Sequence, residues 1–199
     1  MGHLIAIVGN AGVGKTTLAN VLCQHLQLAS GLEQHTERPF QTLFAAHGAR
    51  YALVNQIDYM LVRAEQELTI RHGPLDGVVD GGLEVDFHVF TRHFWQSGKL
   101  DPAEYELCER LYGTLRQLLP PPDLIIQLTA PLEVVAERHR RRNRSLEIAT
   151  ARDLAALAAL LEGWLADVPP ERLLTVDASA DDRTFAAALG VIAARLGEL

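Results

Sequence analysis

The chain has 199 residues, of which 48% are hydrophobic, 22% charged and 6% aromatic, and its formal net charge is −7. This length and composition predict a single soluble domain over residues 1–199 with one good core. The negative charge argues against a protein that wraps nucleic acid, and the longest apolar runs are too short to cross a bilayer. We therefore expect neither a nucleic-acid nor a membrane partner.

The start of the chain and its cysteines predict a compartment. No basic start followed by an apolar stretch precedes the first predicted strand, so nothing in the sequence indicates secretion. Cys23 and Cys108 fall in separate predicted helices and share no metal-ligand spacing with histidines. We expect free thiols in a reducing, cytoplasmic environment.

Apolar runs and helical patterns alternate along the chain. Strands separated by helices predict an α/β protein whose parallel sheet is covered on both faces, because each strand is apolar throughout. In chain order we expect a strand at 3–8, a helix at 15–28, a weak strand at 32–36, helices at 40–47 and 50–72, a strand at 77–80, helices at 86–96 and 101–119, a strand at 123–129, helices at 132–142 and 150–166, a strand at 173–176 and a closing helix at 181–196.

The most specific motif is Gly9-Asn10-Ala11-Gly12-Val13-Gly14-Lys15-Thr16, which fits the phosphate-binding loop GxxxxGK(S/T). The glycines let backbone amides turn toward phosphate oxygens, and the following helix adds the partial positive charge of its N-terminus. Lys15 is expected to bridge the terminal phosphates, and Thr16 to ligate Mg²⁺. A chance Gly-rich turn does not explain the Lys and Thr, so we assign ATP binding to these residues and to Thr17.

A carboxylate ends the strand predicted at 77–80. In a parallel sheet the ligand crevice lies beyond the carboxyl ends of the strands, so Asp80 is expected to face the phosphate-binding loop. A carboxylate is favoured there because a magnesium ion offsets its desolvation. The alternative is that Asp80 merely begins a surface turn, since Asp-Gly is common turn chemistry. We take Thr16 and Asp80 as the metal-side residues.

Further residues carry a family resemblance. They are Glu37-Arg38-Pro39, Gln56 in 51–56, Arg63, Asp86, Phe90, the stretch 97–105, and the run 122–144 with its five arginines between Arg138 and Arg144. Through them the chain, from about residue 4 to 165, resembles the deoxynucleoside kinase family, which phosphorylates deoxycytidine, deoxyguanosine and deoxyadenosine. Seven residues are close to two helical turns, so Gln56 and Arg63 are expected to share a helical face. Asp86 and Phe90 are four residues apart, close to one turn, and are also expected to share a face.

The resemblance implies a P-loop kinase-type three-layer fold with a five-stranded parallel sheet and an Arg-rich lid at about 138–150. It also implies transfer of a phosphoryl group from ATP, with Mg²⁺, to the 5′-hydroxyl of a nucleoside in nucleotide salvage. The helices at 50–72 and 101–119 would form a homodimer. By resemblance Glu37 is the catalytic base, Lys15, Arg142 and Arg144 hold the migrating charge, Arg138 contacts ATP, and Gln56, Arg63, Asp86, Phe90 and Glu147 bind the substrate.

Each of these residues has a structural alternative. Gln56 and Arg63 also fit a solvated helix stripe, Phe90 fits a core residue, and the arginine run fits a solvated basic face. Their combination at the family's spacing favours the functional interpretation. The amide of Gln56 can turn to meet either a purine or a pyrimidine edge, so the sequence does not identify the base.

The chain departs from the family's pattern at two positions. Gly81 stands where an arginine follows the acid, and Ala45 stands where a tyrosine shares the sugar hydroxyl. Arg38 is a candidate to replace the missing guanidinium. The departures leave two alternatives open besides a deoxynucleoside kinase: a nucleotide-binding regulatory subunit of a heteromeric kinase, and a kinase of another small alcohol or of a nucleoside monophosphate.

Overall fold

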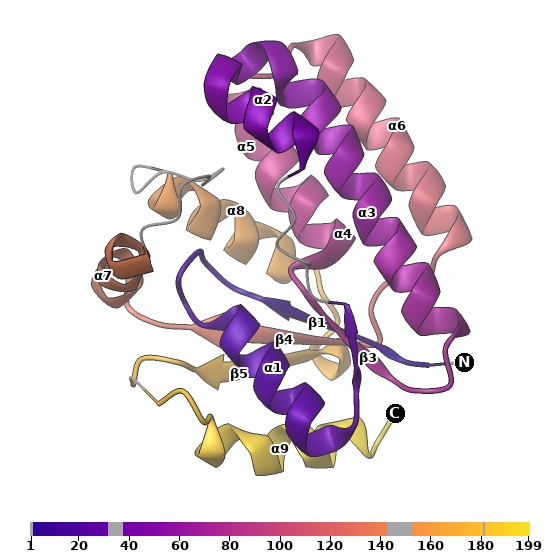
Figure 1. Cartoon of the computed structure of the whole chain (residues 1–199), viewed down its shortest axis with the longest axis vertical. Coiled ribbons are helices and arrows are strands. Elements are labelled where there is room, and N and C mark those ends of the chain that lie inside the picture. Colours follow the sequence, from indigo (N-terminus) through magenta and orange to yellow (C-terminus); the bar gives the residue numbers. More distant parts are fainter. Residues whose placement is uncertain (1, 32–37, 143–152, 181) are drawn as a thin grey trace.

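A computed structural model describes residues 2–31, 38–142, 153–180 and 182–199 of the chain. Its strands form one parallel sheet in the order β2-β3-β1-β4-β5, with helices on both faces (Figure 1). The predicted α/β fold with a five-stranded parallel sheet is therefore confirmed. The strands are β1 (Leu4–Val8), β2 (Ala29–Gly31), β3 (Gly77–Asp80), β4 (Leu124–Thr129) and β5 (Leu173–Asp177).

In the described ranges, no helix is both long and apolar enough to span a membrane. Cys23 and Cys108 are free thiols, as predicted.

The helices follow the predicted order closely. The helical elements are α1 (Lys15–Leu26), α2 (Pro39–His47), η1 (Gly48–Tyr51), α3 (Ala52–His72), α4 (Gly82–Val85), the π-helix η2 (Asp86–Thr91), α5 (Arg92–Gln96), α6 (Pro102–Leu118), α7 (Leu132–Arg142), α8 (Leu154–Leu165), η3 (Pro170–Arg172) and α9 (Ala186–Leu196).

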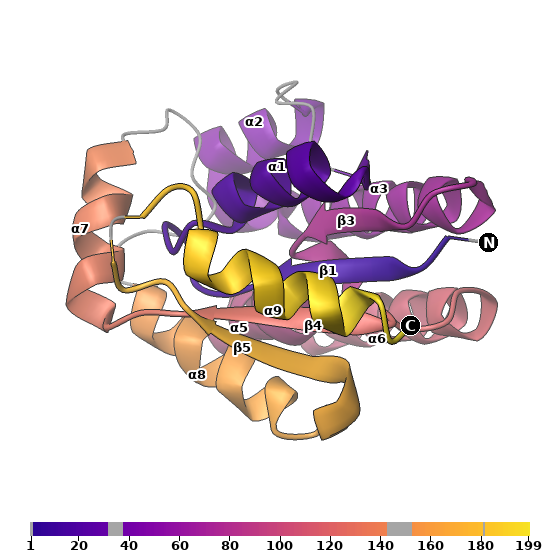
Figure 2. The same ribbon diagram turned by 90° about the horizontal axis from the view of Figure 1, so that it is seen from below.

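The two faces of the sheet carry separate hydrophobic clusters. Ile5 and Ile7 of β1 belong to a cluster with residues of α1 and α9, which lie together on one face in Figure 2. Leu4 and Ala6 point to the other face, where α3, η2 and α8 contribute. The alternation follows from the period of two in a strand, and burial on both sides explains why the strands are apolar throughout.

Several element boundaries differ from the prediction, and three of these differences are informative. The second strand is Ala29–Gly31, whereas the segment 32–36 predicted for it lies outside the described residues. The helix predicted from residue 86 begins at Gly82 instead, and contains a π-helical turn. The last helix begins at Ala186 rather than at residue 181, because Phe185 has a φ of +51° and the carboxylate of Asp182 accepts the Thr184 amide in a turn at 2.8 Å.

The turn after β3 rests on two consecutive glycines with left-handed φ. Gly81 has φ +82° and ψ −70°, and Gly82 has φ +78°. A Cβ placed on Gly81 would meet Val85 at 3.7 Å, which is ordinary contact, so the constraint at this position is conformational rather than steric. Any side chain at position 81, including the arginine of the family's pattern, would therefore strain this backbone.

We predict that Gly81→Ala lowers the free energy of unfolding by about 1–3 kcal/mol, the cost of holding a non-glycine residue in a sparsely populated conformation. Gly163→Ala is the matched control, because Gly163 is exposed in α8 and a Cβ there meets nothing within 4 Å. That change should be neutral or stabilise the protein by up to about 1 kcal/mol. Urea denaturation measures both. Equal stability of Gly81→Ala and the wild type would contradict the strain.

Candidate active site

The loop between β1 and α1 has the conformation that a phosphate site needs. Gly14 caps α1 with a φ of +117°, a backbone conformation that favours glycine, and the helix begins at Lys15. The Lys15 ammonium donates to the carbonyl oxygens of Gly9 at 3.0 Å and Asn10 at 3.2 Å. The loop, its lysine and the helix N-terminus thus form one positively charged mouth.

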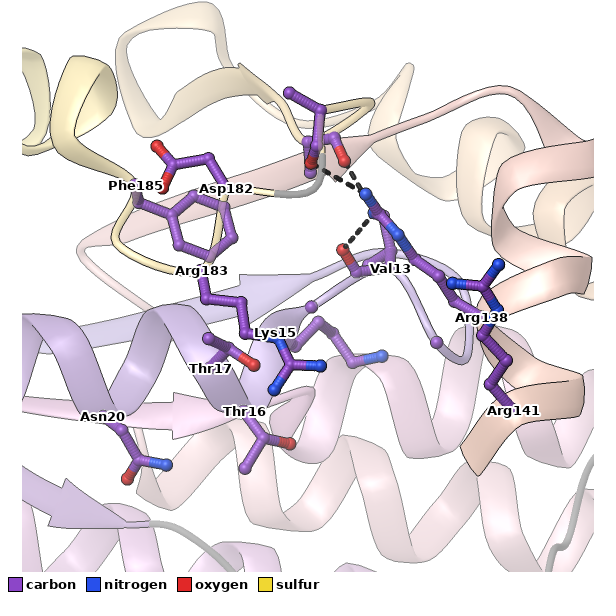
Figure 3. A pocket seen from close by; sticks show the side chains of 14 residues that line it. Val13, Lys15, Thr16, Thr17, Asn20, Arg138, Arg141, Asp182, Arg183 and Phe185 are labelled. Carbon is purple, nitrogen blue, oxygen red and sulfur yellow. Dashed lines mark hydrogen bonds between the residues drawn. The ribbon is translucent and has the colours of Figure 1, made fainter. Parts of the chain in front are cut away.

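A cavity of about 430 Å³ opens at this mouth (Figure 3). Its cationic side chains are Lys15, Arg138, Arg141 and Arg183, and the only carboxylate among the described lining residues is Asp182. This balance suits a polyanion such as a triphosphate. The other lining residues are Gly12, Val13, Gly14, Thr16, Thr17, Asn20, Ala178, Ala180 and Phe185.

The loop that follows β5 forms the far wall of the cavity, and no sequence motif marks it. Arg138 holds it in place: its guanidinium donates to the carbonyls of Ala178 at 2.6 Å, Ser179 at 3.1 Å and Ala180 at 2.7 Å. Arg138 was predicted to contact ATP, and it does line the cavity, but most of its donors serve this loop. The rule that ligands lie beyond strand ends could have found the wall, since Asp177 ends β5.

Not every residue predicted to bind ATP lines this cavity. Gly9, Asn10 and Ala11 are absent from its described lining. The Asn10 side chain instead donates to the carbonyl of Leu154 at 2.9 Å and accepts from the Ala11 amide at 3.0 Å. Asn10 therefore ties the phosphate-binding loop to the start of α8.

The carboxyl ends of β1 and β3 bring the two predicted metal-side residues together. Ile7 lies opposite Asp80 in the sheet, and the Thr16 hydroxyl donates to Oδ2 of Asp80 at 2.5 Å. A hydroxyl and a carboxylate are the hard oxygen donors that Mg²⁺ prefers. In the described part of the chain no three His, Cys, Asp or Glu side chains gather into a metal cage. One hydroxyl and one carboxylate form a donor set that fits magnesium, which proteins usually hold through one or two carboxylates together with substrate phosphates.

A second polar cluster is buried between α3 and η2. Nε of Arg63 lies 3.0 Å from Oδ2 of Asp86, and Nε2 of Gln56 donates to the backbone carbonyl of Asp86 at 3.2 Å. All three residues are buried. The solvated helix stripe is therefore excluded for Gln56 and Arg63, and the face that they were predicted to share meets Asp86. Charges at this depth are costly unless paired, as they are here.

Phe90 differs from its prediction in geometry. Asp86 and Phe90 do not lie in regular α-helix, because residues 86–91 form a π-helix with wider hydrogen-bonded turns. The Phe90 side chain is half-buried and packs against the cluster that contains Val85, Val89 and Ile125. Its role in stacking on a base remains a prediction. Such π-helical turns occur often at functional sites.

Buried ionic groups hold α4 and η2 against the long helices. Arg116 of α6 donates to both carboxylate oxygens of Glu67 at 2.8 Å, and its Nε lies 2.9 Å from Oε1 of Glu84 in an ionic contact without hydrogen-bond alignment. Tyr112 donates to Glu84, and Nε2 of His88 lies 3.4 Å from the same carboxylate.

The charge state of Glu84 follows from these partners. Burial raises the pKa of the Glu84 carboxyl, but the His88 contact, the charge of Arg116 and the Tyr112 hydrogen bond outweigh it, and the pKa lies below its ordinary value. Burial and the Glu84 charge raise the pKa of Tyr112. Glu84 is therefore an anion that fixes the residues just before Asp86.

The remaining predicted site residues divide into two groups. Glu37, Arg144 and Glu147 lie outside the described residues, and Arg142 ends α7 with its side chain outside the description. Ala45 is exposed on α2. Arg38, the candidate replacement for the missing guanidinium, is held by Asp58 of α3 through two hydrogen bonds of 2.6 Å.

The comparisons with known proteins identify the family. A family model described as deoxynucleoside kinase matches residues 5–194. The chain belongs to the deoxynucleoside kinase family. It is a nucleoside kinase, an enzyme whose product is the nucleoside monophosphate.

Two curated relatives and one solved structure support this assignment. The chain is 26% identical over 165 residues to the deoxyadenosine/deoxycytidine kinase of Bacillus subtilis (strain 168), covering 81% of this chain and 76% of that protein. It is 34% identical over 146 residues to the deoxyadenosine kinase of Dictyostelium discoideum, covering 73% of this chain but only 59% of that protein. The structure of a deoxyadenosine kinase from M. mycoides with dCMP and dCDP bound matches with a TM-score of 0.79 at 19% identity, over 98% of this chain and 100% of that one. The structural match supports the fold.

Proposed function

We propose that this deoxynucleoside kinase transfers the γ-phosphoryl group of magnesium-bound ATP to the 5′-hydroxyl of a nucleoside held beside α3 and η2. The observation that carries the proposal is the cavity of the phosphate-binding loop, where Lys15 and three arginines face one described carboxylate. Phosphoryl transfer is catalysed chiefly by positioning and by stabilising charge on the phosphoryl oxygens, and cations at this position supply both.

The donor side follows from the loop. Amides of residues 12–17 would cradle the phosphates, Lys15 would contact the terminal phosphates, and Thr16 with Asp80 would hold the magnesium ion. The ion, when bound, neutralises charge on the β- and γ-phosphate oxygens. Arg138 keeps the loop after β5 against the phosphate side, and Arg141 and Arg183 add positive charge at the entrance.

The acceptor side rests on the buried cluster. Gln56, with Arg63 and Asp86, would meet the edge of the base, Phe90 its face and Glu147 the sugar. Glu37 would orient the 5′-hydroxyl and accept its proton, because an alcohol is a poor nucleophile without a base. The neighbour of Glu37 in the chain, Arg38, is anchored to Asp58, two residues from Gln56. Arg142 and Arg144 would hold charge on the migrating group.

The experiment for the donor site exploits the fact that the chain has only two lysines. We predict that Lys15→Ala abolishes transfer of labelled phosphate from ATP to nucleosides, because the cation at the terminal phosphates is lost. Lys99→Ala is the matched control, since the Lys99 ammonium lies 5.0 Å from the ring centroid of Phe94, away from the phosphate-binding loop. It should keep its turnover. A Lys15→Ala enzyme with wild-type turnover would remove the donor site from this loop.

The experiment for the acceptor side tests the base. Glu37→Gln should lower turnover by about 10²–10⁴-fold while calorimetry still detects ATP binding, the range expected for loss of a general base. Glu65→Gln is the control: it makes the same chemical change on the exposed side of α3 and should leave turnover unchanged. The acceptors tested in this assay also include nucleoside monophosphates. Gly81 stands where the family's pattern has an arginine, so the chemical class of the acceptor is an open question. A fully active Glu37→Gln enzyme would assign the base elsewhere.

We further propose a cytoplasmic homodimer built on α3 and α6. Three apolar side chains of α3 repeat every seven residues and are exposed: Val54 by 37%, Leu61 by 46% and Leu68 by 39%. On α6, which packs beside α3, Leu118 is 75% exposed. A stripe of this kind is typical of a face that another helix covers.

We predict that Leu61→Glu converts the dimer to a monomer, because the carboxylate would be buried without a partner at the interface. Sedimentation velocity measures the change. Val191→Glu places the same charge on α9 at a side chain that is 57% exposed, and should leave the dimer intact. A wild-type protein that sediments as a monomer would contradict the proposed interface.

A further inference from the structure

Thr91 is a buried polar residue to which the sequence assigned no role. It ends the π-helix η2 and has no exposed surface. Its hydroxyl donates to the backbone carbonyl of Asp86 at 2.8 Å and accepts from Nε2 of Gln56 at 2.9 Å. One hydroxyl thus joins the π-helical turn to the residue predicted to read the nucleobase.

These contacts fix which way the Gln56 amide faces. Nε2 of Gln56 also lies 3.2 Å from the carbonyl oxygen of Asp86, and a carbonyl oxygen only accepts hydrogen bonds. The Thr91 proton is already given to the same carbonyl, so the Thr91 oxygen takes the second amide proton of Gln56. A flipped amide would set Oε1 against the Asp86 carbonyl, an acceptor against an acceptor. The network therefore admits one orientation.

Both amide protons of Gln56 are committed, whereas Oε1 accepts no hydrogen bond from the residues that the structure describes. Gln56 is 1% exposed, so an unpaired group beside it is costly. A ligand edge that meets Gln56 must supply a donor. In the sequence the Gln56 amide was free to turn, and the identity of the base was therefore undetermined. Thr91 removes this freedom.

We propose that Thr91 is a specificity-determining positioning residue. It holds Gln56 as a pure hydrogen-bond acceptor and so selects nucleosides whose exocyclic amine lies at C6 of a purine or C4 of a pyrimidine, the corner of the base that meets Oε1. Adenine and cytosine carry this donor at N6 and N4, whereas guanine and thymine carry the acceptors O6 and O4. This inference rests on the proposed function, because it takes Gln56 to face the base.

The kinetic test compares deoxyadenosine and deoxycytidine with deoxyguanosine and thymidine. The wild type should favour the amino-bearing pair by about 10²-fold or more in kcat/KM, since a site built to pair one group rejects the analogue that leaves it unpaired. Thr91→Val removes the hydroxyl at constant shape and should shrink this ratio at least tenfold, mostly through KM. Thr91→Ser keeps the hydroxyl and should retain the ratio. Thr69→Val is the control, because Thr69 makes a similar bond to the carbonyl of Glu65 on exposed α3, without Gln56.

A second measurement does not depend on turnover. In ¹⁵N NMR spectra of the free protein, both side-chain amide protons of Gln56 should exchange slowly in the wild type and in Thr91→Ser. One of them should lose its protection in Thr91→Val. A Thr91→Val protein that keeps both protected protons and the wild-type ratio would overturn the role of Thr91.

The remaining outcomes separate the two levels of the argument. A wild-type enzyme that prefers thymidine or deoxyguanosine would overturn the acceptor-only assignment and leave the kinase proposal standing. A wild-type protein that phosphorylates no nucleoside would overturn the proposed function. If one Gln56 amide proton then still lost its protection in Thr91→Val, the fixed orientation of the amide would be established. Gln56 would nevertheless lose its proposed role in reading the base.

Discussion

The register of β1 against β3 is the constraint on which the site depends. It sets Ile7 opposite Asp80, so the loop that leaves β1 and the turn that leaves β3 begin side by side. The Thr16 hydroxyl then reaches the Asp80 carboxylate at 2.5 Å without any adjustment of helix or strand. A slip by one residue would turn Asp80 to the opposite face of the sheet and separate the hydroxyl from the carboxylate.

The turn after Asp80 connects this edge of the sheet to the acceptor side. Because Gly81 and Gly82 adopt left-handed φ, helical structure resumes at once, and Asp86 follows within a few residues. Glu84, held as an anion by Arg116 and its neighbours, fixes the segment in between. A buried ionic network of this kind adds little net stability compared with apolar packing. We infer that its value is positional, since it presents Asp86 to Arg63 and Gln56.

The sequence predicted features that depend on neighbouring residues, and missed those that depend on tertiary contacts. The loop at Gly9 to Thr16 is a contiguous motif, and the apolar strands and long helices follow from periodicity. Strand β2 is a three-residue Ala-Ser-Gly segment with no apolar run, so only its pairing with β3 defines it. The π-helix leaves no distinct pattern, because a single wider turn hardly alters the spacing of apolar residues.

Two parts of the site could be recognised only from the folded structure. The wall at 178–180 carries no phosphate motif, and it lines the cavity because β5 lies beside β4 and Arg138 reaches across to it. Thr91 resembles any helical threonine in the sequence, and its importance arises only from the carbonyl and the amide that it joins. Gln56, Arg63 and Asp86 were predicted through the family resemblance, and their contacts join two elements, α3 and η2, that are not neighbours in the sequence.

The central claim is that one site holds the phosphates at the glycine-rich loop and the acceptor against the Gln56 cluster. The most direct measurement is a crystal structure with magnesium, a non-hydrolysable ATP analogue and deoxyadenosine. The account predicts Lys15 at the terminal phosphates, the adenine amine on Oε1 of Gln56, and the 5′-oxygen within about 3–3.5 Å of the γ-phosphorus, as a near-attack geometry requires. A nucleoside bound away from Gln56, or phosphates bound away from Lys15, would contradict it.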